Sequence, residues 1–506
     1  MNKFLFSCQK RCLKYIVMAL LLYPLSALAA QGQIVVKGQS LTIPQAIRLI
    51  EKRDGRLYAA ALFYALYCNY YIAFMICIFA VFWYLFYSFR NFRQFFFRGI
   101  AFAVYSLLAS GMAAVLLIPA YMGIKQTASG ADMGLPEHGW QTGFADLITR
   151  QFDMAYPVSH DNFDGNANLY IGVFAVFAVV LYLCNREIRF LDKLKKGLLL
   201  VFFYLSFSED ILYFIWHGFH NQYGIPNRFS FLFGFVLIAM LFEVFEHRDS
   251  IRNWQVVLSC LVGVGLLFVS RNWAESPLDD GMYGAAGMLM ILYGLILFVM
   301  SFDQKHRKWH VTAFSAVAVI EMCVTAVLGF DYVGQISVPK FFSGTEDMDE
   351  AVKSLDDGTF YRSDLADAKM VDENAWYDLN AVGLFGSTAT DGMVRMMDSL
   401  GFYTGANEYL YQGATPVTNL LLNVRYIYYH PEDELYTDFV YKDTFGDFDV
   451  YENPTEGMSI GYMINNDIDQ WFYESAYPFR VQNEFCAFGY GIYDIFEGLD
   501  IPDPAV

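Results

Sequence analysis

Charged residues are scarce in this sequence. They make up 17% of its 506 residues, whereas 56% are hydrophobic and 18% are aromatic. Soluble globular domains carry about 25% charged residues, and long uncharged runs are typical of chains that cross a membrane. The composition therefore indicates an integral membrane protein.

Familiar site motifs are also absent. The eight cysteines contain no CxxC pair and no zinc-ligand spacing, so neither a disulfide framework nor a zinc site is indicated. The sequence has no Walker loop, GxSxG, HExxH or Rossmann fingerprint in a fitting context, and no basic footprint for nucleic acid. We therefore expect no cofactor and no nucleic-acid partner, and no motif supports a divalent metal.

The net charge of −18 is concentrated in one part of the chain. From Asp331 onward there are 32 acidic and 8 basic residues, so this region carries −24 and the residues before it carry +6. The acidity thus belongs to residues 331–506, where the long uncharged runs end. We interpret this region as a soluble domain that follows the membrane part.

Residues 1–30 have the features of a secretory signal peptide: a basic start, an apolar run from Tyr15 to Leu28, and a small-residue cleavage signal at its end. An uncleaved anchor is the alternative. Residues 31–55, QGQIVVKGQSLTIPQAIRLIEKRDG, resemble the start of the N-terminal signalling domain of SusC-type TonB-dependent outer-membrane receptors. We interpret them as a receptor-like remnant at a fused reading frame or a recombinant junction near Gly55.

Residues 56–330 contain eight uncharged runs, and each can supply a helix of about 20 residues if interfacial residues are included. The runs are Leu57–Phe89, Gly99–Ile124, Gly165–Asn185, Gly197–Ser208, Phe229–Phe242, Asn253–Ser270, Gly281–Phe302 and Trp309–Ile320. We predict an α-helical polytopic membrane domain with about eight spans.

Lys and Arg are unevenly distributed over the loops between these runs. Alternate loops hold thirteen of them, and the opposite set holds only Lys125, Arg150, Arg228 and Arg271. By the positive-inside rule the first set is cytoplasmic. The long loop 125–164 and the acidic C-terminal region then lie outside the cytoplasm. Since the receptor-like leader suggests a cell with two membranes, we expect the inner membrane and a periplasmic C-terminal domain.

The acidic region changes its hydrophobic pattern. Met348–Leu355 and Thr390–Leu400 have the spacing of amphipathic helices, whereas Leu420–Tyr429 and Asp447–Tyr451 are typical of strands. We predict a mixed α/β extracytoplasmic domain over residues 331–506. Residues 494–506 have no closing helix or strand pattern, so we expect this domain to be truncated.

The densest polar content at a membrane boundary lies between the fourth and fifth runs. If the fourth span extends from Gly197 to Trp216, Glu209 and Asp210 lie in its outer third, where an ionised carboxylate needs a partner. One of them would then be a general base, or a ligand for a metal or a sugar hydroxyl. If the helix ends at Ser208, both acids are solvated at the interface.

Further polar residues follow in the same stretch. His217 and His220 are three residues apart and would share one face of a helix. They could hydrogen-bond a phosphate or a sugar, or anchor the interface alongside Trp216. Arg228 follows Asn227 at the start of the fifth run. Its guanidinium suits bidentate capture of a lipid-linked phosphate, with general headgroup contact as the alternative.

Two other sets of acids are candidates. Glu321 lies inside the last run and is either functional or hydrogen-bonded to a neighbouring helix. The outside loop carries Asp153, His160, Asp161 and Asp164, which could line a substrate cleft or form a solvated acidic loop.

Several phrases, in order along the chain, resemble the YfhO family of bacterial multi-pass membrane proteins from Leu57 onward. They are CNYYIAFMICIF at 68–79, NANLYIGVF at 166–174, YFIWHGFH at 213–220, NRFSFLFGFVLI at 227–238, GLFGSTATDGMVRMMDSLGF at 383–402, TPVTNLLLNVRYIYY at 415–429 and YPFRVQNEF at 477–485. Members of this family are regarded as GT-C-type glycosyltransferases that use polyprenyl-phosphate sugars.

The resemblance implies a GT-C-like enzyme that takes a sugar from a polyprenyl-phosphate carrier in the lipid bilayer. The acceptor would be an extracytoplasmic glycan, polymer or protein. Family members begin with several more spans, and GT-C enzymes usually place a catalytic acid in the first outside loop. Here the receptor-like residues stand in that place, so we expect the chain to be the middle portion of such a protein.

Together these interpretations select nine residues. The catalytic candidates are Glu209 and Asp210, and the substrate-binding candidates are Arg228, His217, His220, Trp216, Asn227, Asp161 and Asp164. Two alternatives remain open. The chain is a non-catalytic protein that binds or transports a lipid carrier, or it is an inactive fusion or truncated fragment.

Overall fold

The chain divides into two compact units in the computed structural model, Met1–Ala120 with Met133–Gln335, and Tyr121–Asp132 with Ile336–Val506. The described residues are 46, 49–50, 54–87, 89, 91–131, 134–158, 167–220, 225–303, 305–333, 337–366, 368–430, 437–473 and 476–498. The predicted signal peptide and most of the predicted receptor-like remnant lie outside them.

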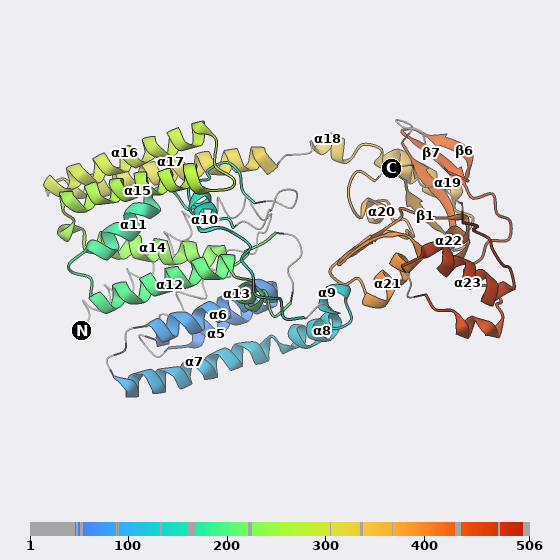
Figure 1. The fold of residues 1–506 in the computed structure, drawn as a ribbon, viewed down its shortest axis with the longest axis horizontal. Helices are drawn as coiled ribbons and strands as arrows, with labels where there is room; N and C mark the ends of the chain where they lie inside the picture. Colours follow the sequence, from blue (N-terminus) through green and yellow to red (C-terminus); the bar gives the residue numbers. More distant parts are fainter. Residues whose placement is uncertain are drawn as a thin grey trace, which may run out of the picture. The chain divides into compact units, whose positions relative to one another are not determined.

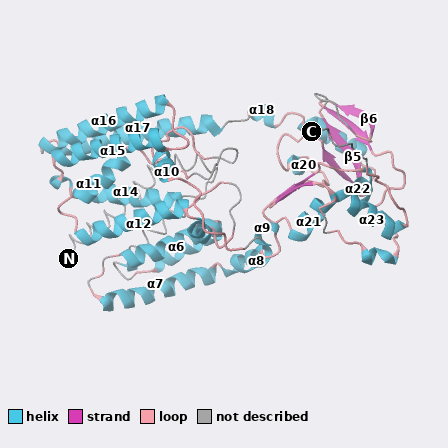
Figure 2. Ribbon diagram, in the orientation of Figure 1, coloured by secondary structure: helices cyan, strands magenta, loops and turns pink. Residues whose placement is uncertain are grey.

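The first unit is helical (Figures 1 and 2). Its described helices are α5 (Arg56–Cys68), α6 (Tyr70–Phe86), α7 (Phe92–Met112), α8 (Ala114–Ile124, which crosses the division between the units), α10 (Phe144–Arg150), α11 (Phe174–Cys184), α12 (Phe190–Ser208), α13 (Asp210–Trp216), α14 (Ser230–Glu246), η1 (Arg248–Ser250), α15 (Asn253–Trp273), α16 (Asp280–Phe302) and α17 (Arg307–Val333).

Helix α14 lies inside this unit. Twelve of its seventeen residues are buried, and its neighbour α11 buries eight of eleven. Helix α11 packs against both α14 and α15, and α16 packs between α15 and α17. Helices that are apolar on every side need an apolar environment all round. For α11 and α14 the other helices supply it, so neither needs the length of a lipid-facing span.

Helix α7 has the opposite environment. Only Ala109 is buried among its 21 residues, although the helix is rich in Phe and Leu. Phe92 and Leu107, for example, are 77% and 72% exposed. An apolar helix with this much exposed surface is typical of contact with lipid.

Four of the described helices are long and apolar enough to cross a membrane: Phe92–Met112, Asn253–Trp273, Asp280–Phe302 and Arg307–Tyr332. The predicted number of about eight spans is therefore not confirmed. The remaining apolar runs form shorter helices, or, in α12, a helix whose first turns carry Asp192, Lys193, Lys195 and Lys196. The first run, Leu57–Phe89, is divided at Asn69, whose side chain caps α6 by accepting the Ile72 N–H at 3.0 Å.

Glu321 connects three segments inside the helical unit. It comes from α17 and is 2% exposed. Its Oε1 accepts the Tyr170 hydroxyl at 2.6 Å and the Val173 N–H at 2.7 Å, and its Oε2 accepts the Tyr293 hydroxyl at 2.5 Å. These partners come from the start of α11 and from α16. The geometry corresponds to the predicted hydrogen bond to neighbouring helices.

The second unit contains the sheets. Its elements are α9 (Ala128–Ala131), α18 (Val338–Phe341), α19 (Thr345–Leu355), β1 (Arg362–Leu365), α20 (Glu373–Trp376), β2 (Leu384–Phe385), α21 (Asp391–Leu400), β3 (Tyr403–Gly405), β4 (Glu408–Leu410), α22 (Pro416–Leu421), β5 (Val424–Tyr429), β6 (Val440–Phe445), β7 (Phe448–Glu452), η2 (Asn466–Gln470) and α23 (Pro478–Tyr490). The predicted helices around 348–355 and 390–400 are confirmed. The predicted strand at 420–429 begins later, at Val424, because α22 extends to Leu421.

A four-stranded sheet in the order β1-β5-β7-β6 organises this unit. Strand β1 is parallel to β5, and the other two pairs are antiparallel. Tyr426 and Tyr428 of β5 belong to a core that includes α19, whereas Val424 and Ile427 belong to a second core with α21 and α23. The sheet is thus buried on both faces, as in a layered α/β domain. Strands β2, β4 and β3 form a separate antiparallel sheet.

The segment 121–132 belongs to the second unit although it precedes most of the helical unit in sequence. The Ala128 N–H donates to the Ala389 carbonyl at 3.0 Å, and the Asp391 N–H donates to the Gln126 carbonyl at 3.0 Å. Thr127 and Thr390 form an isolated antiparallel bridge. The start of the loop after α8 is therefore a structural part of the C-terminal unit.

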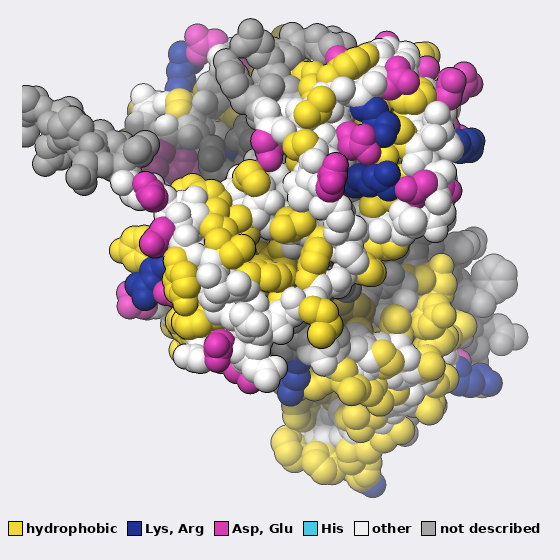
Figure 3. All heavy atoms as spheres, turned by 90° about the vertical axis from the view of Figure 1, so that its right-hand side faces the viewer, with side chains coloured by type: hydrophobic (Ala, Val, Ile, Leu, Met, Phe, Trp, Pro, Cys, Tyr) yellow, Lys and Arg dark blue, Asp and Glu magenta, His cyan; other side chains and the backbone are white. Residues whose placement is uncertain are grey.

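The two units differ in surface character (Figure 3). In this view the helical unit presents mainly hydrophobic side chains, whereas carboxylate and basic side chains are spread over the C-terminal unit. This difference follows the charge distribution of the sequence.

Substituting Glu321 tests its role in packing the helices. Glu321→Ala removes the acceptor of three donors, and each buried donor left unpaired costs about 1–3 kcal/mol. We expect a loss of about 3 kcal/mol of stability, and a smaller loss for Glu321→Gln, which keeps one carbonyl oxygen. Thermal unfolding in detergent micelles, followed by circular dichroism, measures both. The exposed Glu275 provides the control Glu275→Ala, and an equal shift for control and variant would contradict the assignment.

Candidate functional site

The helix of the fourth apolar run ends before the two acids. Helix α12 ends at Ser208, Glu209 is extended with φ −97° and ψ 126°, and α13 begins at Asp210. The Glu209 carboxylate caps the new helix, since Oε2 accepts the Leu212 N–H at 2.8 Å. A single helix from Gly197 to Trp216 is therefore wrong. The helix ends at Ser208, as the alternative has it, but Glu209 is hydrogen-bonded and its side chain is only 13% exposed, so this acid is not simply solvated.

An extended segment lies along this break. The Gln141 N–H donates to the Ser208 carbonyl at 2.8 Å, and the Asp210 N–H donates to the Gly139 carbonyl at 3.3 Å. On the same segment, His138 Nδ1 lies 3.0 Å from Glu209 Oε1. Both carboxylate oxygens of Glu209 thus have partners. Partial burial alone would raise the pKa of Glu209, but these hydrogen bonds outweigh it and lower the pKa.

Asp210 has a different environment. Its Oδ2 lies so close to Gly139 that a Cβ on that residue would be only 2.4 Å away. A side chain at position 139 would therefore collide with the carboxylate. Within the described part of the chain, the Asp210 side chain has neither a hydrogen bond nor an ion pair. Of the two neighbouring acids, Asp210 is the one whose oxygens remain available to a ligand.

Aromatic rings form the buried base of the segment between α12 and α14. Trp216 is 1% exposed and stacks on Phe229 at 4.7 Å with an interplanar angle of 7°. The Trp216 ring also stacks on Phe203 of α12 at 5.8 Å. Large buried rings with this geometry contribute strongly to packing. They fix the path of the chain from α13 to the start of α14, and Trp216 has a structural position.

His217 is fully buried next to this base. Its Nδ1 lies 2.8 Å from the Tyr213 carbonyl, which can only accept, so Nδ1 carries the proton. Burial lowers the pKa of His217 to about 3, and the ring is neutral at physiological pH. Its buried Nε2 has no hydrogen-bond partner among the described residues. The packing of this ring against Tyr213, at 4.2 Å, indicates a structural contribution.

Tyr71 of α6 brings the remaining candidates together. The Arg228 guanidinium lies 5.5 Å from the centre of its ring, His217 lies at 6.2 Å and His220 at 6.0 Å. Arg228 Nε also donates to the Ile225 carbonyl at 3.1 Å, which fixes the guanidinium beside the start of α14.

Two further features complete the geometry. Asn227 is buried and has a positive φ of 51°, an unusual conformation that turns the chain into α14. Burial raises the pKa of the Tyr213 hydroxyl, and the Tyr213 ring packs 4.2 Å from the ring of His217.

Seven of the nine predicted site residues lie in the described part of the chain, and all seven belong to this one segment. Asp161 and Asp164 lie outside the described residues. Sequence reasoning missed Tyr71 and Tyr213 and did not pair His138 with Glu209. Both tyrosines stand in apolar runs with many other aromatic residues, so no spacing distinguishes them.

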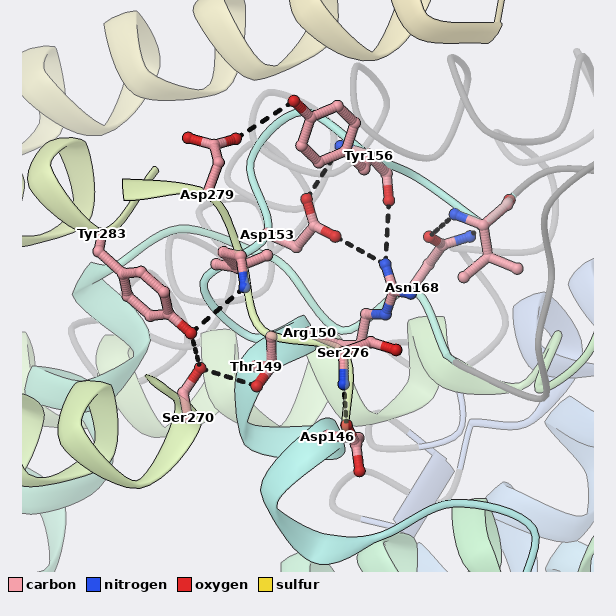
Figure 4. A network of polar contacts seen from close by, with 12 residues as sticks. Asp146, Thr149, Arg150, Asp153, Tyr156, Asn168, Ser270, Ser276, Asp279 and Tyr283 are labelled. Atoms are coloured by element: carbon pink, nitrogen blue, oxygen red, sulfur yellow. Dashed lines mark hydrogen bonds and ion pairs between the residues drawn. The ribbon is translucent and has the colours of Figure 1, made fainter. Parts of the chain in front are cut away.

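Two other acids of the loop 125–164, Asp146 and Asp153, belong to a structural network (Figure 4). Asp153 accepts Arg150 Nη1 at 2.7 Å and the Tyr156 N–H at 2.9 Å, and burial raises its pKa despite these contacts. The Tyr156 hydroxyl donates to Asp279 at 3.2 Å, and Asp146 accepts the Ser276 N–H at 3.2 Å. These contacts join the α10 region to the turn between α15 and α16. For Asp153 they favour a structural role over a cleft-lining one.

No group of three or more His, Cys, Asp or Glu side chains among the described residues has the arrangement of a metal site. The cysteines in this part of the chain are unpaired. The chemistry of the segment therefore consists of one available carboxylate, one guanidinium, two histidines and their aromatic surroundings.

The Glu209 cap makes stability depend on pH. Because the folded-state pKa of Glu209 is lowered, its contribution is present above the unfolded pKa, about 4.3, and is lost as the pH falls through the folded value. We expect Glu209→Gln to cost about 1 kcal/mol at pH 7, with the difference from the unsubstituted protein disappearing below about pH 4. Thermal unfolding in detergent between pH 3 and pH 8 measures this. The control Glu275→Gln should show no such dependence, and a constant difference over the pH range would contradict the cap.

Comparison with known proteins agrees with this architecture. Residues 41–487 match the family model described as bacterial membrane protein YfhO. The match begins sixteen residues before Leu57, where the sequence resemblance was located, and extends through both units. No curated protein and no solved structure matches the chain. Since the family match covers most of the 506 residues, the chain belongs to the YfhO family of bacterial membrane proteins.

Proposed function

We propose that this membrane protein transfers a sugar from a polyprenyl-phosphate carrier to an extracytoplasmic glycan, polymer or protein. One observation carries the proposal: the stretch between α12 and α14 combines a carboxylate, Asp210, that has no hydrogen bond or ion pair among the described residues, with a guanidinium, Arg228, fixed at the start of α14. An acid that removes a proton and a cation that binds a phosphate are the two groups that such a transfer needs.

In the proposed reaction, Asp210 accepts the proton of the acceptor hydroxyl. The acceptor oxygen then attacks the anomeric carbon, and the bond from that carbon to the carrier phosphate oxygen breaks. The electron pair leaves with the phosphate, whose charge the Arg228 guanidinium stabilises. Attack from the face opposite to the leaving group inverts the anomeric centre.

The other residues orient these two groups. Glu209 is a poor base, since both of its oxygens are hydrogen-bonded and its pKa is lowered. His217 is buried and neutral, so it cannot bind a phosphate as a cation. Its contribution is the hydrogen bond to the Tyr213 carbonyl. His220, beside Tyr71, is the histidine with a suitable position for a sugar hydroxyl. In this proposal the stacked Trp216 ring and the Asn227 turn form the buried base of the site.

The proposed topology has about eight passes through the inner membrane, with the C-terminal unit in the periplasm. It is supported by the excess of Lys and Arg in alternate loops. A second support is the pairing of residues 126–128 with 389–391, since hydrogen-bonded backbone segments must lie on the same side of a membrane. Both segments would be outside in this topology.

A second function is binding of the lipid carrier without catalysis. The single observation that favours it is that only one of the two candidate acids is available. Both oxygens of Glu209 are hydrogen-bonded, to His138 and to the Leu212 N–H, which leaves Asp210. Binding of the carrier phosphate would require Arg228 and not Asp210. Separate substitutions therefore distinguish the two functions.

The variant Asp210→Asn tests catalysis. It keeps the shape of the side chain but removes the base, so we expect transfer to fall about 10²–10⁴-fold with carrier binding unchanged. The assay uses the purified protein in proteoliposomes with polyprenyl phosphates that carry labelled hexoses, and measures loss of label from the carrier. The control is Asp280→Asn, an exposed acid paired with Arg271 on the same predicted side. Unchanged transfer in Asp210→Asn would exclude Asp210 as the base.

The variant Arg228→Lys tests the phosphate contact. Lysine keeps the charge but loses the planar fork, so we expect affinity for a polyprenyl phosphate to fall about tenfold. Arg271→Lys is a matched control, because that guanidinium also lies over a tyrosine ring, Tyr283, at 5.7 Å. Equilibrium binding is measured with and without excess phosphatidylglycerol. Binding that phosphatidylglycerol abolishes, or an equal loss in both variants, would indicate general headgroup contact instead.

A further inference from the structure

The C-terminal unit has an aromatic cluster outside its two hydrophobic cores. Phe341, Phe342 and Trp376 contact one another, with ring centres 5.2–5.3 Å apart. Trp376 comes from α20, and the two phenylalanines lie at the end of α18 (Figure 1). None of the three belongs to the cores on either face of the four-stranded sheet. The three rings therefore contact one another and are not part of either core.

Much of this cluster is exposed. Val338, one turn before Phe342, is 69% exposed, and Phe342 and Trp376 are 48% and 44% exposed. The residues just before α20 add Met370 and Val371, which are 38% and 47% exposed. We call the set Val338, Phe341, Phe342 and Trp376 the α18–α20 patch. Contiguous exposed apolar surface of this kind marks an interaction site.

Two lysines lie beside the patch, in a region that is otherwise strongly acidic. Lys340 is an exposed residue of α18 itself. Lys369 donates from Nζ to the Ser343 carbonyl at 3.0 Å and to its hydroxyl at 3.1 Å, next to Phe342. These are two of only eight basic residues after Asp331.

Several of the neighbouring acids are turned into the protein. Glu373 is 2% exposed and accepts the Tyr377 hydroxyl at 2.9 Å, and Asp372 accepts the Phe385 N–H at 2.7 Å. Asp347 accepts the Asp447 N–H at 3.2 Å. The exposed acids nearby are Asp378, two residues after Trp376, and Glu346, Asp349 and Glu350 of α19. The apolar rings and the two lysines therefore form the patch, with exposed acids at its edge.

Chain length keeps the patch near the membrane. Helix α17 is one of the candidate spans and ends at Val333, and the patch begins at Val338. Five residue steps reach at most about 18 Å. A bilayer's headgroup and interfacial zone, on either side of the hydrocarbon core, is several ångströms deep. The patch is thus tethered within reach of the bilayer surface by the covalent chain alone.

We propose that the α18–α20 patch inserts into the boundary between headgroups and acyl chains, in the leaflet where α17 ends. Phe and Trp rings occupy this zone because they combine a large apolar surface with, for Trp, one hydrogen-bond donor. Lys340 extends beside them to the phosphates of anionic lipids, and Lys369, held by Ser343, adds a positive charge nearby. This contact anchors the C-terminal unit to the membrane that its neighbouring helix crosses, and it does not depend on the proposed transfer reaction.

Photo-crosslinking of the full chain tests the contact. Phe342→p-benzoylphenylalanine is reconstituted in vesicles of phosphatidylethanolamine and phosphatidylglycerol, irradiated, and analysed by mass spectrometry for lipid adducts. The control carries the same group at Met463, a 96% exposed side chain of the same unit. We expect about tenfold more lipid adduct at position 342 than at position 463.

A second position protects the test against local misfolding. The same label at Val338, the most exposed member of the patch, disturbs the ring contacts least and should also give lipid adducts. Equal adduct yields at the patch positions and at 463 would overturn the proposal. Crosslinks from 338 and 342 to peptides of this chain or of a second copy would also overturn it, because a protein surface would then cover the patch.

Discussion

The helical unit depends on satisfying backbone groups where the helix of the fourth apolar run is interrupted. Away from water, each unpaired N–H or carbonyl is costly, so an interrupted helix must find other partners. At the break after α12, Gln141 donates to the Ser208 carbonyl, Gly139 accepts from Asp210, and the Glu209 side chain caps α13. The extended segment 139–141 thus replaces the hydrogen bonds that a continuous helix would have had. Without it, the chain could not leave the helix direction at this point.

The break also separates the roles of two neighbouring acids. Glu209 is extended and directs its carboxylate to the Leu212 N–H and to His138, whereas Asp210 begins the next helix and directs its carboxylate to the space beside Gly139. One acid stabilises the turn, and the other stays available. Neither could exchange roles with the other, because the cap requires the residue before the helix and the close approach requires a glycine opposite. The stack of Trp216 on Phe229 then fixes the start of α14, directly after Arg228.

Much of this architecture could be predicted from the sequence, and the exceptions have physical reasons. The apolar runs that form α15, α16 and α17 were predicted because lipid-facing helices need length and apolar residues on every side. The same rule predicted about eight spans, a number that is not confirmed, since α11 and α14 are covered by protein and are shorter than a lipid-facing span. In the C-terminal unit, the 3.6-residue spacing predicted α21, but no local pattern predicts that β1 pairs with β5, some sixty residues away.

The candidate site shows the same division between local and distant information. Charged and aromatic residues within the stretch 209–228 were recognisable, because polar groups are conspicuous at a membrane boundary. Their partners were not, since His138 lies 71 residues before Glu209 and Tyr71 comes from a different helix. These distant partners decide the chemistry: His138 and the Leu212 N–H occupy Glu209, and Tyr71 positions Arg228. A sequence can thus indicate candidate site residues, but which of them remain available for a ligand depends on contacts that only the folded chain makes.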